Sequence, residues 1–315
     1  MELTVIICTY NPRPGTIAQT LAALRAQTLP PTQWELVIID NASTNGVPAG
    51  LDLGWHPHAR RLVEPTKGIA AARHRAYAEV LGGESQVLLF VDDDTLLDPD
   101  YLATGLAFAA QDPRLGCWGG QLLPRYELDP PEWFPPFRKY LAIFPLDRDL
   151  VADTFNGNHD YLPPTAGMFL RRQLIAHYFA LNTTDPVRLS FGSKGNFLLR
   201  GEDTDLALSS YDCGLRTGRF QALRLTHLIS KDRVTLDYVE RVLEGVRTNM
   251  LLIDHLRGRS LPPQPGIFQR LRQRWQVKRL PERQGRFLAA ELRGERKARE
   301  IIAAAAAVPP SPRAP

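Results

Sequence analysis

Short apolar segments alternate with segments of helical composition through the first third of the chain. Most of the apolar segments are β-branched and lack polar alternation, which is typical of strands buried on both faces of a sheet. They predict strands at residues 3–8, 35–40, 60–65 and 86–91. Residues 17–26 and the alanine-rich segment 67–83 predict intervening helices. This order predicts an α/β fold with a Rossmann-like, mostly parallel central sheet and helices on both faces.

Local signals place several further boundaries. Thr16 is expected to cap the first helix, and Asp98, with Pro99 at the first helical position, is expected to open a helix that reaches about Ala110. In the second half of the chain, the sequence predicts an irregular surface segment at 123–140 and a strand leading into a helix at 165–172. A Gly/Lys loop and then an acidic helix start are expected within 191–214, and a late strand is expected at 221–230. Beyond about residue 235 the chain is expected to be helical, with a break at Pro281 and a disordered tail at 308–315.

Three of the predicted strands end on polar side chains. These are Thr9 to Asn11, Asp40, and the run Asp92, Asp93 and Asp94. Because ligands of such sheets bind at the carboxyl ends of the strands, we expect these positions to converge in space.

The stretch "LLFVDDDTLLDPD", which begins at residue 88, runs from four apolar residues directly into three adjacent carboxylates. Adjacent carboxylates repel one another unless a cation lies between them, and Mg²⁺ or Mn²⁺ binds one or two carboxylates and completes its shell with water and phosphate. The alternative is a solvated acidic turn that caps the next helix. Apolar residues on both sides place this turn against the core, which favours the metal site.

Other candidate residues have two interpretations each. Glu202 and Asp203 stand at an expected helix start, where acids favour the helix dipole, but one of them could serve as a general base. His227 is either a structural histidine or a nitrogen ligand to a carboxylate-bound metal. Lys67, Gly68 and Arg73 begin a helix and suit an anion or nucleotide, although a solvated helix end is equally compatible. Trp133, Phe134 and Phe137 could stack on a sugar ring or pin their own loop.

Charge and cysteine content narrow the class of protein. The 315 residues carry a formal net charge of +4, and 44% are hydrophobic, as in a soluble globular protein. Between Arg257 and Glu300 there are thirteen Lys or Arg and four Glu, an excess of nine, which indicates an anionic partner such as a phospholipid surface or nucleic acid. Cys8, Cys117 and Cys213 form no CxxC pair, which suits a reducing cytosol. The N-terminus predicts a strand and not a signal peptide, and no apolar run approaches the ~20 residues that span a bilayer.

Five motifs together resemble the family 2 glycosyltransferases of the GT-A fold. They are "VIICTYNP", "LVIIDNASTNG", "KGIAAARHRAY", "LLFVDDDTLL" and "GEDTDLALSSYDCG", which occur in the family's order and approximate spacing over residues 3–235. The resemblance implies an enzyme that transfers a sugar from a nucleotide-diphosphate sugar to an acceptor hydroxyl, with inversion and with a bound Mn²⁺ or Mg²⁺. It also implies a catalytic domain at 1–235, with a nucleotide-sugar half at about 1–120 and an acceptor half at about 121–235, followed by a basic helical extension at 236–315.

By position the resemblance assigns roles to single residues. Thr9 and Asp40 would contact the nucleoside, Arg73 would lie near the nucleotide, and Asp92 would meet the ribose. Asp94 would bind the metal, Asp203 would be the catalytic base with Glu202 beside it, and His227 would join Asp94 and Asp92 in the metal shell. Tyr10, Asn11, Lys67, Gly68 and Asp93 complete the expected nucleotide-sugar site.

The chain departs from the family in two places. The family's "ARN" reads "ARH" here, so that His74 replaces an asparagine, and the QxxRW motif of processive synthases is absent, because "QRLRQRW" has the residues but not the spacing. A single-transfer enzyme is therefore expected in place of a polymerase. The rival classes are a haloacid-dehalogenase-like phosphatase, whose Asp-x-Asp-x-Thr motif is not matched at Thr95, and a non-catalytic sugar-nucleotide-binding protein.

The basic extension contains an amphipathic pattern. Ile267, Leu271 and Trp275 recur every four residues with Phe268 beside them, and the remaining positions carry Arg270, Arg272, Arg274, Lys278 and Arg279. Such a helix either lies on an anionic membrane surface or packs on the catalytic domain. We expect a saccharide or lipid-linked acceptor and no nucleic acid partner. The expected location is cytoplasmic, and the basic extension adds the expectation of peripheral attachment at the inner face of the membrane.

Overall fold

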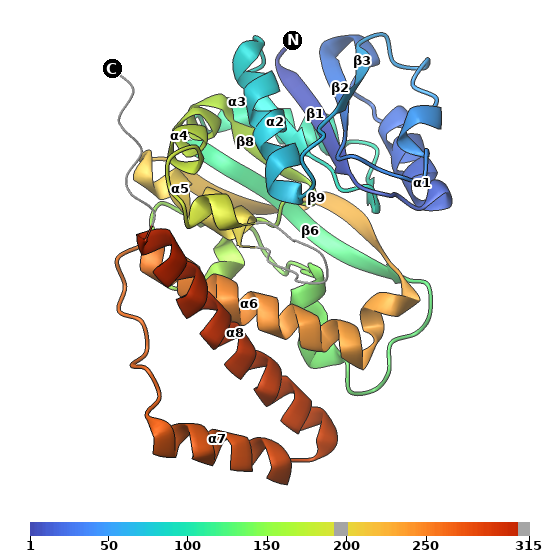
Figure 1. Ribbon diagram of the computed structural model, residues 1–315. Coiled ribbons are helices and arrows are strands. Elements are labelled where there is room, and N and C mark those ends of the chain that lie inside the picture. Colours follow the sequence, from blue (N-terminus) through green and yellow to red (C-terminus); the bar gives the residue numbers. More distant parts are fainter. Residues whose placement is uncertain (192–200, 308–315) are drawn as a thin grey trace. The chain divides into compact units, whose positions relative to one another are not determined.

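The computed structural model describes residues 1–191 and 201–307 of the chain (Figure 1). The chain divides into two compact units. The first comprises Met1–Leu181 and Asp203–Lys231, and the second comprises residues 182–202 and the segment that follows residue 231. Residues 192–200, which belong to the expected Gly/Lys loop, and the expected disordered tail at 308–315 lie outside the described residues.

The first unit is built on a sheet whose first four strands are parallel. They are β1 (Leu3–Thr9), β2 (Trp34–Asp40), β3 (Ala59–Val63) and β4 (Val87–Phe90), in the spatial order β3-β2-β1-β4. The residues of β4 are all buried, and β1 and β2 are nearly so, as their continuous apolar composition predicts. The predicted strands at these positions are confirmed.

The remaining strands extend this sheet with mixed pairing. They are β5 (Thr95–Leu97), β6 (Leu115–Tyr126), β7 (Leu150–Ala152), β8 (Met168–Arg171) and β9 (Arg216–Ile229). The order continues β4-β8-β6-β9-β5, with β7 also paired to β9. Only β6–β9 among these pairs is parallel, whereas β4–β8, β6–β8, β5–β9 and β7–β9 are antiparallel. The expectation of a mostly parallel sheet therefore holds for β1 to β4 and is wrong for the rest, because there strands that are distant in sequence pair with one another.

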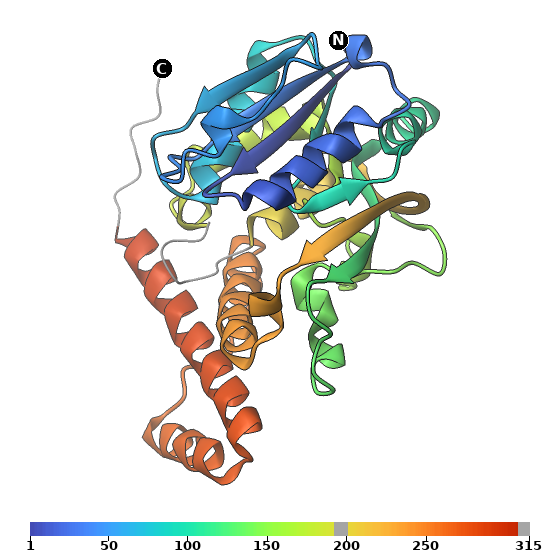
Figure 2. The same cartoon turned by 90° about the vertical axis from the view of Figure 1, so that its right-hand side faces the viewer.

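Helices cover both faces of the sheet, as predicted. The helices of this part of the chain are α1 (Pro14–Arg25), α2 (Ile69–Gly82), α3 (Tyr101–Gln111), α4 (Arg172–Asn182) and α5 (Glu202–Asp212). One core cluster joins Leu3, Val5 and Ile7 of β1 to residues of α1 and α3. On the other face the ring of Tyr77 from α2 lies 5.9 Å from that of Phe90 and 6.0 Å from that of Tyr178 in α4. Figure 2 shows α1 in front of the parallel strands and α2 behind them.

Two predicted helix caps are wrong. Helix α1 begins two residues before Thr16, because Pro14 occupies a favourable first position and the Arg13 carbonyl accepts the first helical N–H groups. Helix α3 begins after Asp100 and not at Asp98, whose backbone N–H donates to the Arg224 carbonyl of β9 at 3.0 Å and thus continues the sheet.

The segment 123–140 is only partly irregular. Its first residues belong to β6, and Pro135–Leu141 form the 3₁₀ helix η3. Phe134 is fully buried and its ring lies 6.3 Å from that of Tyr126, which favours the loop-pinning interpretation for this residue. Shorter 3₁₀ turns are η1 (Pro31–Gln33), η2 (Pro48–Gly50), η4 (His159–Tyr161), η5 (Arg188–Ser190) and η6 (Lys231–Val234).

Three α-helices lie in the described part of the second unit that follows residue 231. They are α6 (Leu236–Leu256), which Thr235 caps by accepting the Tyr238 N–H, α7 (Ile267–Arg279) and α8 (Glu282–Ala306). Pro281 separates α7 from α8, as predicted. Within the described residues, no helix has the length and apolar character needed to cross a membrane.

Candidate active site

The polar ends of β1, β2 and β4 meet at one edge of the sheet. The Thr9 hydroxyl, at the end of β1, donates a short hydrogen bond to the Asp93 carboxylate, which follows β4. The Thr9 carbonyl accepts the N–H of Asn41, which follows β2, at 2.8 Å. The predicted convergence of these strand ends is therefore confirmed.

A tight turn connects the aspartates to β5. The Asp92 carbonyl accepts both the Thr95 N–H at 3.2 Å and the Thr95 hydroxyl at 2.9 Å. Strand β5 then runs antiparallel to β9, with Thr95 opposite His227, and the Leu228 N–H donates to the Asp94 carbonyl at 2.8 Å. This pairing places the Nε2 atom of His227 at 3.5 Å from Oδ1 of Asp94. Both residues are buried, with exposed fractions of 4% and 8%.

The Asp94–His227 pair supplies two donor atoms of the kinds that Mn²⁺ and Mg²⁺ accept. Within residues 1–191 and 201–307, no group of three or more His, Cys, Asp and Glu side chains is arranged to hold a metal ion. A carboxylate oxygen and an imidazole nitrogen still fit an ion whose remaining positions are filled by water and phosphate oxygens. The residues present are thus compatible with the expected metal, as a partial shell.

Asn11 and Asp40 organise the loop that follows β2. Asn11 has a left-handed backbone (φ 49°), and its side-chain oxygen accepts the N–H groups of Thr44 at 2.8 Å and Asn45 at 3.2 Å. The Asp40 carboxylate accepts the Ser43 N–H at 2.9 Å. Two residues that the sequence assigns to the expected nucleotide site therefore also fix the backbone of residues 43–45.

Asn41, which the sequence analysis does not single out, lies beside Thr9 at the same edge of the sheet. It is buried, and its amide nitrogen donates to the carbonyls of Glu64 at 3.3 Å and Thr66 at 2.6 Å, while its oxygen accepts the Gly68 N–H at 2.7 Å. One side chain thus ties the end of β2 to the start of α2, where Gly68 has a φ of 126° that favours glycine. In the sequence, only its position directly after Asp40 links Asn41 to the expected site.

The basic residues of the predicted site lie around the start of α2. The Lys67 ammonium is 5.8 Å from the centre of the exposed Tyr10 ring. The Arg73 guanidinium donates to the Thr165 hydroxyl at 2.7 Å and lies 5.7 Å from the centre of the Phe90 ring. Arg73 therefore links α2 to the residues before β8.

His74, which replaces the family's asparagine, stacks on Phe179 of α4 with ring centres 4.4 Å apart. Burial lowers the pKa of its imidazole, and the nearby Glu64 carboxylate opposes that shift. The neutral form is therefore favoured at this position.

Glu202 and Asp203 open α5 as predicted. Glu202 is buried, and the division between the two units falls between these two residues. The carboxylate of Asp203 accepts the Thr204 N–H at 2.8 Å. The position at a helix start is thus confirmed, whereas the catalytic roles of both residues stay predictions.

The fold of the chain is the GT-A fold. Solved structures of glycosyltransferases align with nearly the whole chain: S. aureus TarS (residues 1–349) in complex with UDP has a TM-score of 0.54 at 13% identity and covers 95% of this chain and 92% of its own. The mannosyltransferase PcManGT from Pyrobaculum calidifontis, in complex with GDP-Man and Mn²⁺, also has a TM-score of 0.54 at 19% identity, over 99% of this chain and 76% of its own. At these identities the likeness shows the fold.

The chain belongs to glycosyl transferase family 2, whose sequence model matches residues 4–178, more than half of its length. A curated relative, the glucosyl-dolichyl phosphate glucuronosyltransferase of Haloferax volcanii, is 26% identical over 137 residues. That match covers 43% of this chain and 42% of the relative, so the chain spans less than half of that relative. The phosphatase and non-catalytic alternatives find no support in these comparisons.

Proposed function

We propose that this protein transfers a sugar from a nucleotide-diphosphate sugar to an acceptor hydroxyl. The observation that carries the proposal is the convergence of Thr9, Asp93, Asp94 and His227 at the carboxyl edge of the sheet. Ligands of open α/β sheets bind at this edge. The similar solved structures contain UDP, UDP-GlcNAc or GDP-Man, which supports a nucleotide sugar as the donor.

The donor site would be formed by the start of α2 and the ends of β1, β2 and β4. In this proposal Asp40 and Thr9 contact the nucleoside, and Asp92 contacts the ribose. Tyr10, Asn11, Lys67, Gly68, Arg73 and Asp93 form the remainder of the site. Lys67 and Arg73 supply positive charge near the start of α2, where a helix N-terminus also favours a phosphate.

Asp94 and His227, with Asp92 beside them, would hold a Mn²⁺ or Mg²⁺ ion. A divalent cation at this position neutralises charge on the diphosphate leaving group. The short distance between Asp94 Oδ1 and His227 Nε2 supports a shared ligand for these two atoms. The likeness to a structure solved with Mn²⁺ supports the choice of ion.

Asp203 would be the general base that removes the proton from the attacking acceptor hydroxyl. Inversion at the anomeric carbon requires attack from the face opposite the leaving diphosphate. A carboxylate at the first turn of α5 is held by the Thr204 N–H, which supports a fixed position for it. Glu202 is the alternative base, and its burial favours Asp203 for contact with a substrate.

The enzyme would make single transfers to a saccharide or lipid-linked acceptor. The curated relative carries a dolichyl phosphate in its name, which supports a lipid-linked acceptor here. A lipid-linked acceptor lies in a membrane, so we propose peripheral electrostatic attachment of the basic C-terminal helices to the anionic inner face of the membrane. No nucleic acid partner is expected.

The test is release of a nucleoside diphosphate from a panel of UDP, GDP and dTDP sugars, measured with Mn²⁺, with Mg²⁺ and with EDTA. We expect one donor to release its diphosphate in a metal-dependent manner. Release of inorganic phosphate from a phosphate monoester in place of diphosphate would favour the phosphatase class. Binding of a nucleotide sugar without turnover with any acceptor preparation would favour the non-catalytic class.

A further inference from the structure

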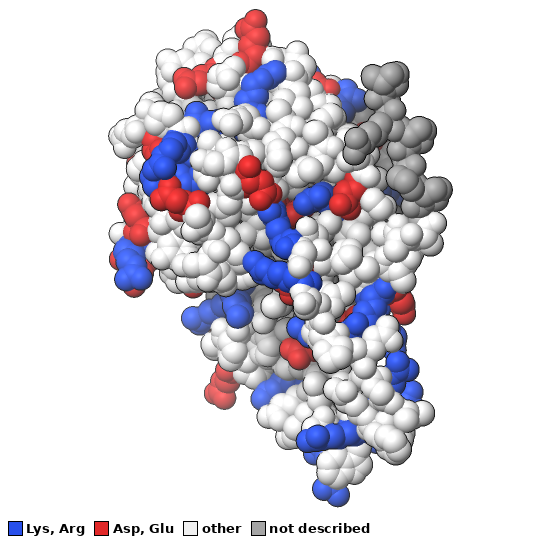
Figure 3. All heavy atoms as spheres, turned by 90° about the vertical axis from the view of Figure 1, so that its left-hand side faces the viewer, with Lys and Arg blue, Asp and Glu red and all other residues white. Residues whose placement is uncertain are grey.

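Helix α7 exposes its apolar side chains. Ile267, Phe268, Leu271 and Trp275 have exposed fractions between 53% and 85%, and none of the thirteen residues of α7 is buried. The helix also carries five cations and no acid, namely Arg270, Arg272, Arg274, Lys278 and Arg279. The space-filling view shows lysine and arginine side chains spread over the C-terminal helices (Figure 3).

The apolar side chains lie on one side of the helix. At about 100° per residue, Ile267, Leu271, Trp275 and Phe268 fall within a sector of roughly 100°. Arg274 borders the sector on one side, and Arg272 and Arg279 border it on the other. Lys278 lies within the same range of angles, near the C-terminal end of the helix. The Arg279 guanidinium lies 4.0 Å from the centre of the Trp275 ring. Long basic side chains in these positions can reach phosphate groups while the apolar side chains point below them.

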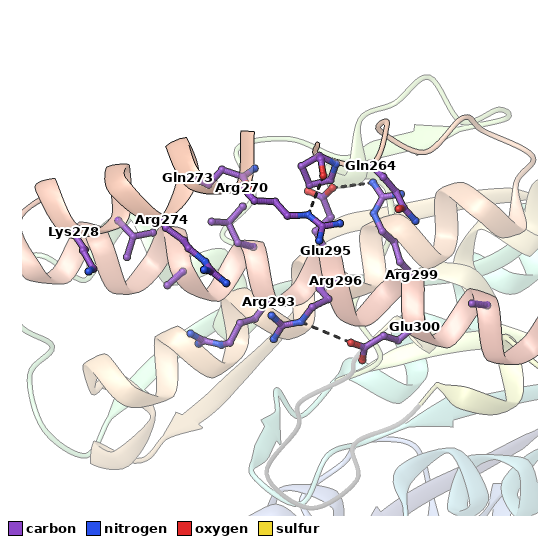
Figure 4. Close-up of a pocket in the computed structure, with 15 residues that line it drawn as sticks. Gln264, Arg270, Gln273, Arg274, Lys278, Arg293, Glu295, Arg296, Arg299 and Glu300 are labelled. Atoms are coloured by element: carbon purple, nitrogen blue, oxygen red, sulfur yellow. Dashed lines mark hydrogen bonds and ion pairs between the residues drawn. The ribbon is translucent and has the colours of Figure 1, made fainter. Parts of the chain in front are cut away.

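A different side of α7 faces α8. Arg270, Gln273, Arg274, Val277 and Lys278 line a cleft of about 750 Å³ together with residues of α8 (Figure 4). A Cβ atom at Gly285, near the start of α8, would lie 2.6 Å from the Val277 carbonyl, so the two backbones approach closely there. Arg270 also donates to the Pro265 carbonyl at 2.9 Å, just before α7 begins.

Helix α8 is in turn fixed on α6. Arg293 pairs with Glu244 at 2.6 Å, Arg286 pairs with Glu240 at 2.6 Å, and the Thr248 hydroxyl donates to the Gly294 carbonyl at 3.0 Å. Because α8 has this support and α7 packs on α8 through another side, the described residues of the second unit leave the apolar sector of α7 uncovered.

We propose that α7 inserts its apolar sector into the interfacial layer of an anionic phospholipid bilayer. Charge complementarity selects this occupant: a second copy of α7 would bring five cations against five, whereas an anionic headgroup layer compensates them and also accepts the apolar side chains. The inference rests on the peripheral attachment proposed above and deepens it from electrostatic contact to insertion by named residues.

The first test measures the depth of Trp275. Vesicles of phosphatidylcholine and phosphatidylglycerol with brominated acyl chains quench a tryptophan that enters the bilayer, and Trp275→Phe provides the signal of the four other tryptophans for subtraction. We expect Trp275 to be quenched in anionic vesicles. Salt-sensitive vesicle binding without quenching of Trp275 would overturn insertion while leaving the electrostatic attachment in place.

The second test compares two double variants of equal charge change. Phe268→Glu with Leu271→Glu alters the apolar sector, and Gln269→Glu with Gln276→Glu alters another side of the same helix. We expect the first to weaken vesicle binding at least about tenfold more than the second. Equal weakening by the two double variants would overturn the proposal. The proposal would also be overturned if the protein formed a dimer that only the first double variant disrupts, because a second copy of the chain would then cover the apolar sector. Circular dichroism of both variants checks that α7 remains folded. Diphosphate release in solution measures the proposed sugar transfer independently of vesicle binding.

Discussion

The Nε2 atom of His227 lies 3.5 Å from Oδ1 of Asp94, although 132 residues separate the two positions in the chain. Antiparallel pairing of β5 with β9 produces this proximity, because it sets Thr95 opposite His227 and joins the Leu228 N–H to the Asp94 carbonyl. The backbone, and not the side chains alone, therefore determines where a carboxylate and an imidazole meet. That property suits the proposed metal site, because the backbone holds its two donor atoms close together.

The Asp94–His227 pair leads to the first prediction. Asp94→Ala should abolish metal-dependent nucleotide binding and turnover, and His227→Ala should weaken metal binding by about 10-fold or more, since each removes one of two donor atoms. Calorimetric titration of UDP or GDP with and without Mn²⁺ measures the effect. His255→Ala, on α6, is the matched histidine control and should behave like the wild type. Full turnover of Asp94→Ala in EDTA would exclude the proposed metal site.

The Thr9–Asp93 hydrogen bond gives a second prediction. Thr9→Val removes the donor without a large change in volume, and we expect a loss of about 1 kcal/mol in the free energy of unfolding together with weaker nucleotide binding. Thr4→Val is the control, because Thr4 donates to Ser85 at 2.7 Å from the opposite end of the same strand. It should lose similar stability and keep normal nucleotide affinity. If both variants bind nucleotide equally, Thr9 has a structural role only.

The proposed base gives a third prediction. Asp203→Asn should leave donor affinity nearly unchanged and reduce turnover by about 10²–10⁴, the usual contribution of a positioned base. The substitution keeps an oxygen that accepts the Thr204 N–H, so the start of α5 should remain intact. Steady-state kinetics with a single donor and acceptor measure the change. The roles would be reversed if Glu202→Gln proved inactive while Asp203→Asn was nearly normal.

The sequence predicted the parts of the fold that depend on local composition. The apolar β-branched runs of β1, β2 and β4 identified their strands, and the polar residues that end them identified the edge where Thr9 and Asp93 meet. Both signals are local, since they need only the burial of each strand and the direction of the chain.

The features that escaped prediction depend on distant partners. Strand β5 has only three residues, and its pairing with β9 makes it a strand and delays α3 beyond Asp98. Asn41 resembles any loop asparagine until the backbone of residues 64–68 is folded around its amide. The mixed pairing of β6, β8 and β9 likewise has no signature in one strand alone.

Burial of His56 gives a fourth prediction, on stability and pH. Burial, helped by the nearby His58 and opposed by Glu35, lowers the pKa of His56 from 6.5 to about 4. The Nδ1 atom accepts the His58 N–H at 3.2 Å, and the ring packs edge-on against Trp34 with centres 4.2 Å apart, so the folded state holds the neutral form.

The sign follows from the difference between the folded and unfolded states. The unfolded chain binds a proton on this histidine below about pH 6.5 and the folded chain does not, so the stabilisation is complete above that pH and decreases as the pH falls toward 4. His56→Asn keeps an acceptor for the His58 N–H and removes the titrating ring. It should be less stable at pH 8 but show a shallower loss between pH 6.5 and 4 in chemical denaturation. His255→Asn, which removes an exposed histidine, should lose stability between pH 6.5 and 4 as steeply as the wild type. If His56→Asn also lost stability as steeply as the wild type, the buried His56 would not be the cause of this pH dependence.

The close packing of α8 on α6 gives the last prediction. A Cβ atom at Gly294 would lie 2.4 Å from the Glu244 carbonyl and 3.0 Å from Cβ of Arg247, so that Gly294→Ala must separate the two helices. Overpacking of this kind typically costs about 1–3 kcal/mol. Separation would also weaken the hydrogen bond from Thr248 to the Gly294 carbonyl and the Arg293–Glu244 ion pair, because both cross the same contact.

Gly15→Ala is the matched control for this substitution. Gly15 lies in the first turn of α1, and nothing lies within 4 Å of the position that its Cβ atom would occupy. The same chemical change should therefore stabilise α1 by about 0.5–1 kcal/mol. Calorimetry and limited proteolysis at α6 and α8 measure both effects, and nucleotide binding reports on the first unit. Because the contact that Gly294 makes lies wholly within the second unit, Gly294→Ala should open α8 to protease while nucleotide affinity stays normal. Equal protease resistance in Gly294→Ala and the wild type would show that α6 and α8 do not require this close approach.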